Sequence, residues 1–121
     1  MTITIQSEHF PPSVNSLFAN VSGRGRVRTK RYREWAAASG WDCQGKGSIT
    51  GPFTAAIILS RKHRRSNADL DNRVKPLLDL LQAHKVIEDD KYLEKLTVEW
   101  GDCKGFYIEI TPYPITESER N

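Results

Sequence analysis

Two aspartates, a lysine and a second acidic cluster are the residues in this sequence whose types and spacing best suit chemistry. Asp69 and Asp71 are one residue apart, Lys75 follows Asp71 by four positions, and residues 88–90 read Glu-Asp-Asp. Two neighbouring carboxylates repel each other, and a hard divalent cation offsets that repulsion. Mg²⁺ prefers carboxylate oxygens together with water and phosphate. The segment therefore predicts a divalent-metal site, with Lys75 placed to neutralise a phosphate beside it.

The spacing of Asp69 and Asp71 decides which backbone conformation lets them share a ligand. Side chains at i and i+2 point about 200° apart on a helix, whereas in an extended segment they point the same way. We therefore expect an extended lead-in with Leu70 as a buried pivot. Asp71 would be the N-cap of a helix that begins at Asn72. Pro76 either distorts the first turn or moves the regular start of the helix towards itself.

Asp90 is the third candidate metal ligand, and Asp89 beside it is able to exchange with it. Both lie beyond the far end of a helix of roughly 13–16 residues, or ~20–24 Å at ~1.5 Å per residue. The acidic loop cannot reach Asp69 along that helix. The following strand must run back beside the helix, or the loop must fold against the sheet edge, before the three carboxylates can meet.

Positive charge is concentrated in the first half of the chain. Residues 1–66 carry 11 Lys or Arg against 3 Asp or Glu, whereas residues 67–121 carry 7 against 12, and the net charge is +3. A basic surface attracts polyanions. A metal that bridges carboxylates and phosphate would let the acidic second half of the chain act on a polyanion that the basic first half attracts. The candidate DNA-binding residues form two clusters, one of Arg24, Arg26, Arg28, Lys30 and Arg31 and the other of Arg61, Lys62, Arg64 and Arg65.

Hydrophobic periodicity predicts an α+β domain in the order β-α-β-α-β-β, with two helices packed on a four-stranded mixed sheet. The expected strands cover residues 2–6, 52–60, 93–100 and 105–111, the last two as a hairpin. The strand over 52–60 is apolar throughout, so we expect cover on both faces. A loop runs to Arg28, Thr29 caps a helix from Lys30, and Gly40 ends it. Residues 1–114 would form one domain, followed by a polar tail at 115–121.

Several classes of protein are disfavoured by composition. No apolar run approaches the ~18 residues that span a membrane, and the N-terminus lacks the basic and apolar regions of a secretory signal. Cys43 and Cys103 are far apart and form neither a disulfide framework nor a cysteine zinc site. We expect reduced thiols in a cytoplasmic protein, and a bridge between the two cysteines is the alternative.

Two further side chains bear on the site. Asp79 lies four residues after Lys75, and we expect it on an exposed polar face of the helix. Phe18 lies in the loop before the first basic cluster. It is either a wedge that props open a branched substrate or a residue that packs within the loop.

The motifs resemble a known family. The segment Asp69-Leu70-Asp71-Asn72 with Lys75, the run Val86 to Asp90, and Phe10-Pro11-Pro12-Ser13-Val14-Asn15 together resemble the RusA family of Holliday-junction resolvases. The resemblance implies a dimeric, Mg²⁺-dependent endonuclease that nicks paired strands at four-way DNA junctions, with Mn²⁺ as a plausible substitute for Mg²⁺. By position it implies that Asp69, Asp71 and Asp90 bind metal and that Lys75 is catalytic. Lys75 would stabilise the transition state or position the nucleophilic water.

Two other functions compete with this hypothesis. One is a non-catalytic protein that binds junction or duplex DNA and uses its acidic residues structurally. The other is a nuclease that uses Asp89, Asp90 and Lys91, although that arrangement normally places its acid and lysine on one strand. Two symmetric cuts need two active sites. A dimer interface is expected on the exposed face of the C-terminal hairpin or on the N-terminal strand.

Overall fold

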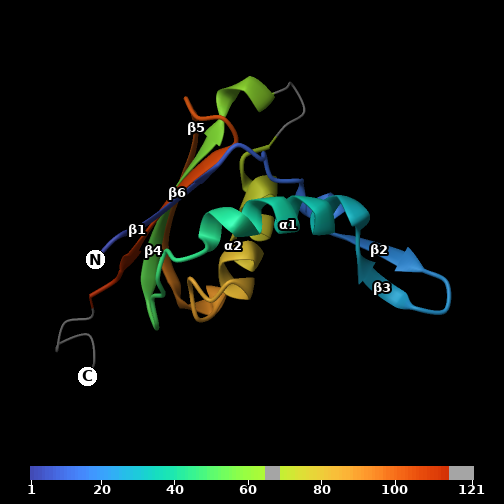
Figure 1. Ribbon diagram of the computed structural model, residues 1–121, viewed down its shortest axis with the longest axis horizontal. Helices are drawn as coiled ribbons and strands as arrows, with labels where there is room; N and C mark the ends of the chain where they lie inside the picture. Colours follow the sequence, from blue (N-terminus) through green and yellow to red (C-terminus); the bar gives the residue numbers. More distant parts are fainter. Residues whose placement is uncertain (65–68, 115–121) are drawn as a thin grey trace.

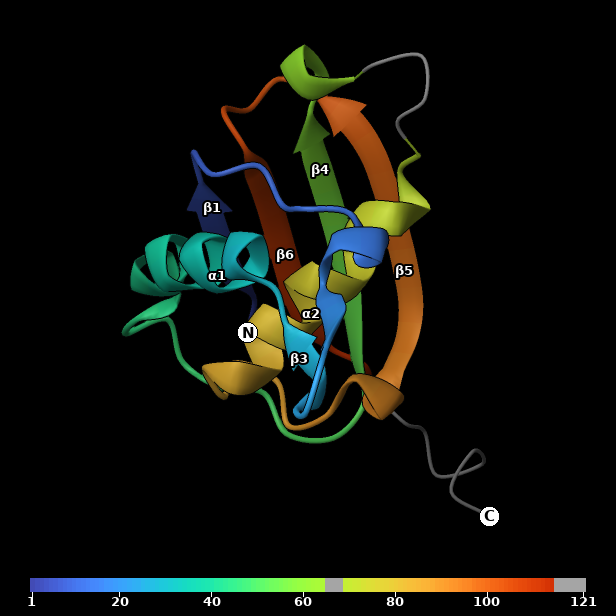
Figure 2. The same cartoon turned by 90° about the vertical axis from the view of Figure 1, so that its right-hand side faces the viewer.

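The fold is a four-stranded mixed sheet with two helices on one side (Figure 1). The computed structural model describes residues 1–64 and 69–114. The strands β1 (Ile3–Ser7), β4 (Phe53–Ser60), β5 (Leu93–Gly101) and β6 (Phe106–Pro112) lie in the order β1-β6-β4-β5. The helices α1 (Lys30–Cys43) and α2 (Val74–Ala83) lie in front of this sheet in Figure 2. The predicted α+β class and its two-helix, four-strand composition are confirmed.

The strand β4 is the centre of the sheet and of the core. It pairs antiparallel with β6 and parallel with β5. The burial of its side chains alternates along the strand. Phe53, Ala55, Ile57 and Leu59 are buried under the helices, while the residues between them are half-buried on the other face. The prediction that this strand would be covered on both faces is therefore wrong, since both helices pack on the same side.

The predicted hairpin of β5 and β6 is also wrong, because β4 lies between these two strands. The crossover β4-α2-β5 places β5 parallel beside β4, as a right-twisted sheet favours. The antiparallel β6 then occupies the other side of β4, where it also pairs with β1. The connection over residues 102–105 crosses the end of β4, and the Ser60 N–H donates to the Gly105 carbonyl at 3.0 Å.

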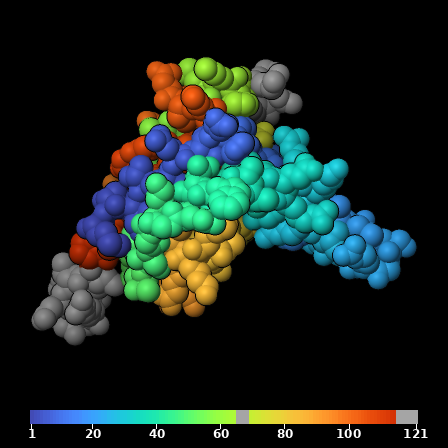
Figure 3. Space-filling model, viewed as in Figure 1, coloured from blue at the N-terminus to red at the C-terminus, as the bar shows by residue number. Residues whose placement is uncertain are grey.

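A second, two-stranded sheet was not predicted. The strands β2 (Phe18–Val21) and β3 (Gly25–Arg28) form an antiparallel hairpin in the segment expected to be a loop. Gly23 and Gly25 have φ values of 77° and 73°, which a glycine adopts without strain in a tight turn. The strands are short and largely exposed, so their sequence has no hydrophobic alternation. The hairpin projects from the body of the molecule as an arm (Figure 3).

The helix α1 starts as predicted and ends later than predicted. The Thr29 side chain accepts a hydrogen bond from the Tyr32 N–H at 3.1 Å, which confirms the N-cap. Gly40 does not end the helix, which continues to Cys43. Gly40 is buried, and a Cβ there would come 2.7 Å from Nε2 of His84. The imidazole of His84, at the C-terminal end of α2, therefore lies over the space that Gly40 leaves open.

The helix α2 begins at Val74, after a 3-10 turn over Asp71–Arg73. Pro76 falls in the first helical turn, where its missing N–H has no partner to lose. Leu77, Leu78 and Leu81 are buried, which confirms the predicted core stripe. Cys43 and Cys103 are free thiols. Within the described ranges, the helices are too short or too polar to cross a membrane.

Candidate active site

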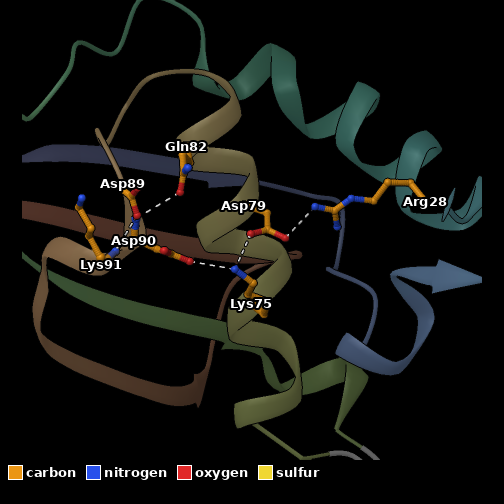
Figure 4. A network of polar contacts seen from close by, with 7 residues as sticks. All are labelled: Arg28, Lys75, Asp79, Gln82, Asp89, Asp90 and Lys91. Atoms are coloured by element: carbon orange, nitrogen blue, oxygen red, sulfur yellow. Dashed lines mark hydrogen bonds and ion pairs between the residues drawn. The ribbon is translucent and has the colours of Figure 1, made fainter. Parts of the chain in front are cut away.

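The fold brings Asp90 to Lys75. The Lys75 Nζ lies 2.9 Å from Asp90 Oδ2 and 2.9 Å from Asp79 Oδ1 (Figure 4). The helix α2 has only 10 residues, and the chain after it turns back so that Asp90 lies beside the helix rather than beyond it. The Asp90 N–H donates to Gln82 Oε1 at 3.2 Å, which fixes the backbone of the acidic loop to α2. The convergence of Asp90 with Lys75 comes from this return of the chain.

Asp89 is engaged in the turn before β5. Its Oδ1 accepts a hydrogen bond from the Lys91 N–H at 3.0 Å and caps the 3-10 turn Asp90–Tyr92. Asp90, and not Asp89, is therefore the acid that contacts Lys75. Because Asp90 and Lys91 lie in a 3-10 turn and not on one strand, the arrangement of the competing nuclease that uses Asp89, Asp90 and Lys91 is disfavoured.

The two charges hold each other in the ionised form. The hydrogen bond to Asp90, followed by that to Asp79, raises the pKa of Lys75 above its usual value. The hydrogen bond from Lys75 lowers the pKa of Asp90. The side chains of Lys75 and Asp90 remain 50% and 31% exposed, so both are accessible to a substrate. At neutral pH the site therefore presents an ammonium and a carboxylate.

Asp69 and Asp71 lie on the approach to α2, in a conformation that differs from the prediction. Leu70 has helical angles (φ −58°, ψ −47°), so the expected extended lead-in is wrong. Leu70 still packs partly buried against the core, as expected of a pivot. Asp71 is exposed and is not the N-cap of α2, a position that Arg73 occupies, and Asp69 accepts from Asn72 Nδ2 at 3.2 Å. The turn is thus closed by local hydrogen bonds in place of an N-cap by Asp71.

The three predicted metal ligands do not form a closed cluster. Among residues 1–64 and 69–114, no group of three or more His, Cys, Asp or Glu side chains is placed to hold a metal ion. Asp71 precedes Lys75 by four residues in the chain, and Asp90 contacts Lys75 directly. The donor set consists of exposed or half-exposed carboxylates, which suits a hard cation such as Mg²⁺. The chemistry of the residues fits the metal.

The N-terminal Pro-Pro stretch packs beneath the acidic turn. The Arg73 Nη1 donates to the Pro11 carbonyl at 3.0 Å, and its guanidinium lies 5.1 Å from the Phe10 ring centroid. Phe10 in turn stacks on His63 at 4.4 Å and on Trp100 at 6.2 Å. Because Arg73 ends the 3-10 turn that starts at Asp71, this packing fixes the acidic turn to the body of the protein.

The first basic cluster lies on the arm and at the start of α1. Arg26 and Arg28 place their guanidinium carbons 4.4 Å and 4.3 Å from the Phe18 ring centroid, so both contact the same aromatic ring. Phe18 is thereby packed within the arm, which favours the packing alternative over the wedge. Arg24 lies in the exposed turn, and Lys30 and Arg31 are exposed in the first turn of α1.

The second basic cluster follows β4. Arg61 and Lys62 lie in the 3-10 turn Arg61–His63, and both side chains are exposed, as is Arg64. The Arg61 Nη2 donates to the Trp100 carbonyl at 3.2 Å. Arg65 lies outside the described residues. This cluster precedes the acidic turn in the chain and is available to contact a polyanion.

The sequence did not identify Asp79 as part of the site. The prediction that Asp79 lies on an exposed polar face is wrong, because its side chain is only 13% exposed and contacts both Lys75 and Arg28. These three residues line a cavity of about 380 Å³ together with Gln82, Ala83 and Asp90. The i, i+4 spacing from Lys75 to Asp79 was the available signal. The contact with Arg28 had none, because Arg28 comes from 51 residues away.

Comparison with known proteins gave one family. The sequence model of the family described as Endodeoxyribonuclease RusA matches residues 9–111. A search of curated proteins gave no match.

Proposed function

Because the chain belongs to the RusA family of endodeoxyribonucleases, we propose that it resolves four-way (Holliday) DNA junctions by paired, Mg²⁺-dependent phosphodiester nicks. The observation that carries this proposal is the contact of Lys75 with Asp90 in a solvent-accessible cavity, where Lys75 follows Asp71 by four positions in the chain. The neighbouring arm and the turn after β4 supply exposed basic residues for the DNA backbone. Attraction by these residues would be independent of DNA sequence and sensitive to salt.

Asp69, Asp71 and Asp90 would hold the metal, which supplies a Lewis acid and an activated water when bound. Lys75 supplies a fixed positive charge beside the scissile phosphate, where negative charge grows in the transition state. Its raised pKa keeps it protonated at neutral pH, so it acts as a cation and not as a base. Of the two roles open to Lys75, this charge supports stabilisation of the transition state.

Replacement of Asp71 by Asn tests the catalytic proposal. We expect Asp71→Asn to abolish Mg²⁺-dependent nicking of a synthetic four-way junction while junction binding is kept, because the change removes a charge and leaves the shape. Asp102→Asn is the matched control, since Asp102 is an exposed acid in the β5–β6 connection. Cleavage retained by Asp71→Asn would remove Asp71 from the site. Salt-sensitive binding by the wild type without any Mg²⁺-dependent product would favour the non-catalytic DNA-binding alternative.

Paired nicks require two active sites, and the free edge of β5 supports a homodimer. Among the described strands, β5 pairs only with β4 and leaves its other edge open. An unpaired edge is a template for another strand. Leu96 on β5 is 38% exposed. A second copy of the chain would continue the sheet through an antiparallel β5–β5 contact.

Charge selects one register for that contact. A two-fold axis perpendicular to the sheet keeps each side chain on its own face, so residue i lies opposite a residue of the same parity. A contact centred on Thr97 places Lys95 opposite Glu99 and Leu96 opposite Val98, each pair twice. Opposite charges across a strand pair stabilise it, and like charges destabilise it. The bulge beside Phe53 limits regular pairing to residues after Glu94.

A charge exchange tests this dimer. We expect Lys95→Glu to shift the protein towards monomer, because two Glu–Glu contacts replace two ion pairs. The double change Lys95→Glu with Glu99→Lys should restore the dimer. Sedimentation equilibrium measures both. A dimer unaffected by Lys95→Glu would exclude the β5 edge as the interface.

A further inference from the structure

Asp79 lies between two cations from different elements. Its Oδ1 is 2.9 Å from the Lys75 Nζ and its Oδ2 is 3.1 Å from the Arg28 Nη2 (Figure 4). The Asp79 side chain is 13% exposed, whereas Lys75 and Arg28 are 50% and 35% exposed. Each carboxylate oxygen therefore serves one cation, and the aspartate is the least exposed member of the group.

Arg28 is fixed independently of Asp79. Its guanidinium carbon lies 4.3 Å from the Phe18 ring centroid and 4.4 Å from the Tyr32 ring centroid. Phe18 and Arg28 belong to the arm, and Tyr32 belongs to the first turn of α1. Contacts of a guanidinium with two aromatic rings restrict its orientation. Arg28 thus anchors the base of the arm, and its bond to Asp79 connects the arm to α2.

Lys75 has two carboxylate partners, and only one of them is a candidate metal ligand. Asp90 belongs to the proposed metal site, and a carboxylate that serves a divalent cation is a weaker partner for an ammonium. Asp79 lies on the same helix four residues after Lys75, so its contact does not depend on the acidic loop. The remaining partner that keeps Lys75 at the site is therefore Asp79.

We infer that Asp79 is a positioning residue for the nuclease reaction, which keeps the Lys75 ammonium at the scissile phosphate and joins it to the DNA-binding arm through Arg28. This inference rests on the proposed function of the same site. The competing view is that Asp79 only stabilises the fold through its two ion pairs. The two views differ in whether the loss of Asp79 slows cleavage only when Lys75 is present.

Asp79→Asn is the test, measured as single-turnover nicking of a four-way junction at saturating enzyme. The amide keeps the shape and removes the charge, so we expect cleavage to slow by about tenfold or more while junction affinity changes little. Glu34→Gln is the matched control, because it removes an exposed i, i+4 carboxylate from the Lys30–Glu34 pair on α1. Wild-type cleavage rates in folded Asp79→Asn protein would overturn the inference.

A double variant separates positioning from stability. If Asp79 acts through Lys75, Asp79→Asn slows cleavage in the wild-type background and adds no further loss in a Lys75→Ala background. Equal losses in both backgrounds would overturn the inference, because a purely structural role does not depend on Lys75. Thermal unfolding of each variant confirms that the assays use folded protein.

A readout without cleavage distinguishes failure of the inference from failure of the proposed function. Reductive methylation of lysines in the presence of Mg²⁺, read by mass spectrometry, reports how firmly Lys75 is paired. We expect Asp79→Asn to accelerate methylation of Lys75 several-fold relative to Lys91, because the ammonium loses its partner. No acceleration would overturn the inference even if the wild-type protein cleaves no junction.

Discussion

At the scale of single residues, the contact between Lys75 and Asp90 couples stability to pH. The lowered pKa of Asp90 means that the stabilisation is present above the ordinary carboxyl value, about 4, and is lost as pH falls through the lowered pKa. The raised pKa of Lys75 means that the stabilisation is present below the ordinary lysine value and is lost only as pH rises through the raised pKa. The contribution is therefore constant around neutrality.

Asp90→Asn should remove this acid-dependent contribution. In the presence of a chelator, we expect a loss of at most about 1 kcal/mol in the free energy of unfolding between about pH 6 and about pH 9, because the pair is half-exposed and screened by solvent. The difference between variant and wild type should shrink as pH falls through the lowered pKa of Asp90, because the protonated carboxyl no longer pairs with Lys75. Urea unfolding at each pH measures it. A difference that persists at the acid end would contradict the assigned cause.

At the scale of elements, Gly105 decides how β1 and β6 meet. A Cβ at Gly105 would lie 2.6 Å from the Glu8 carbonyl carbon, 2.6 Å from the His9 N and 2.7 Å from the Ser7 carbonyl oxygen. These are backbone atoms, which cannot rotate away. The chain leaving β1 therefore requires glycine at this position of the β5–β6 connection.

Gly105→Ala should lower the free energy of unfolding by about 1–3 kcal/mol, the usual cost of overpacking. Gly40→Ala is the matched control, because its Cβ meets only the exposed His84 side chain, which can move. The gain of about 1 kcal/mol in helix propensity should offset that contact. Thermal unfolding compares the two variants. Equal melting temperatures for Gly105→Ala and Gly40→Ala would contradict the close backbone approach at Gly105.

At the scale of the whole molecule, the arm projects away from the sheet (Figure 3). Arg24 and Arg26 are exposed on it, whereas Arg28 is bound to Asp79. The three arginines therefore differ in role, although the sequence presents them as one series. Arg24 and Arg26 are the exposed members, Arg26 also packs on Phe18, and Arg28 joins the arm to Asp79.

The combined change Arg24→Gln with Arg26→Gln should weaken junction binding in a salt-dependent way. Each phosphate contact contributes about 0.9 to the slope of log affinity against log salt concentration. We expect the slope to fall by about 2 if both arginines contact phosphate, with no change in the melting temperature. Fluorescence anisotropy at several salt concentrations measures the slope. A slope equal to that of the wild type would remove the arm from the DNA interface.

Local sequence predicted the features that depend on near neighbours. Thr29 caps α1 because its own side chain reaches the Tyr32 N–H three residues on. The leucines of α2 form a core stripe because helix periodicity alone places them on one face. The extended conformation expected at Leu70 was wrong. Asn72 donates to the Asp69 carboxylate and Arg73 donates to the Pro11 carbonyl, and these two hydrogen bonds hold a turn around Leu70.

The sequence by itself supplied the candidate groups for the proposed chemistry, since Asp69, Asp71, Lys75 and Asp90 were selected from residue type and spacing. Only the tertiary structure decided which groups meet. In the folded chain β4 lies between β5 and β6. Asp90 contacts Lys75, and Arg28 of the arm contacts Asp79. The physical reason is that these contacts join residues 15 and 51 positions apart in the chain. Helix and strand periodicity carry no information about contacts at such separations, which the packing of the whole core sets.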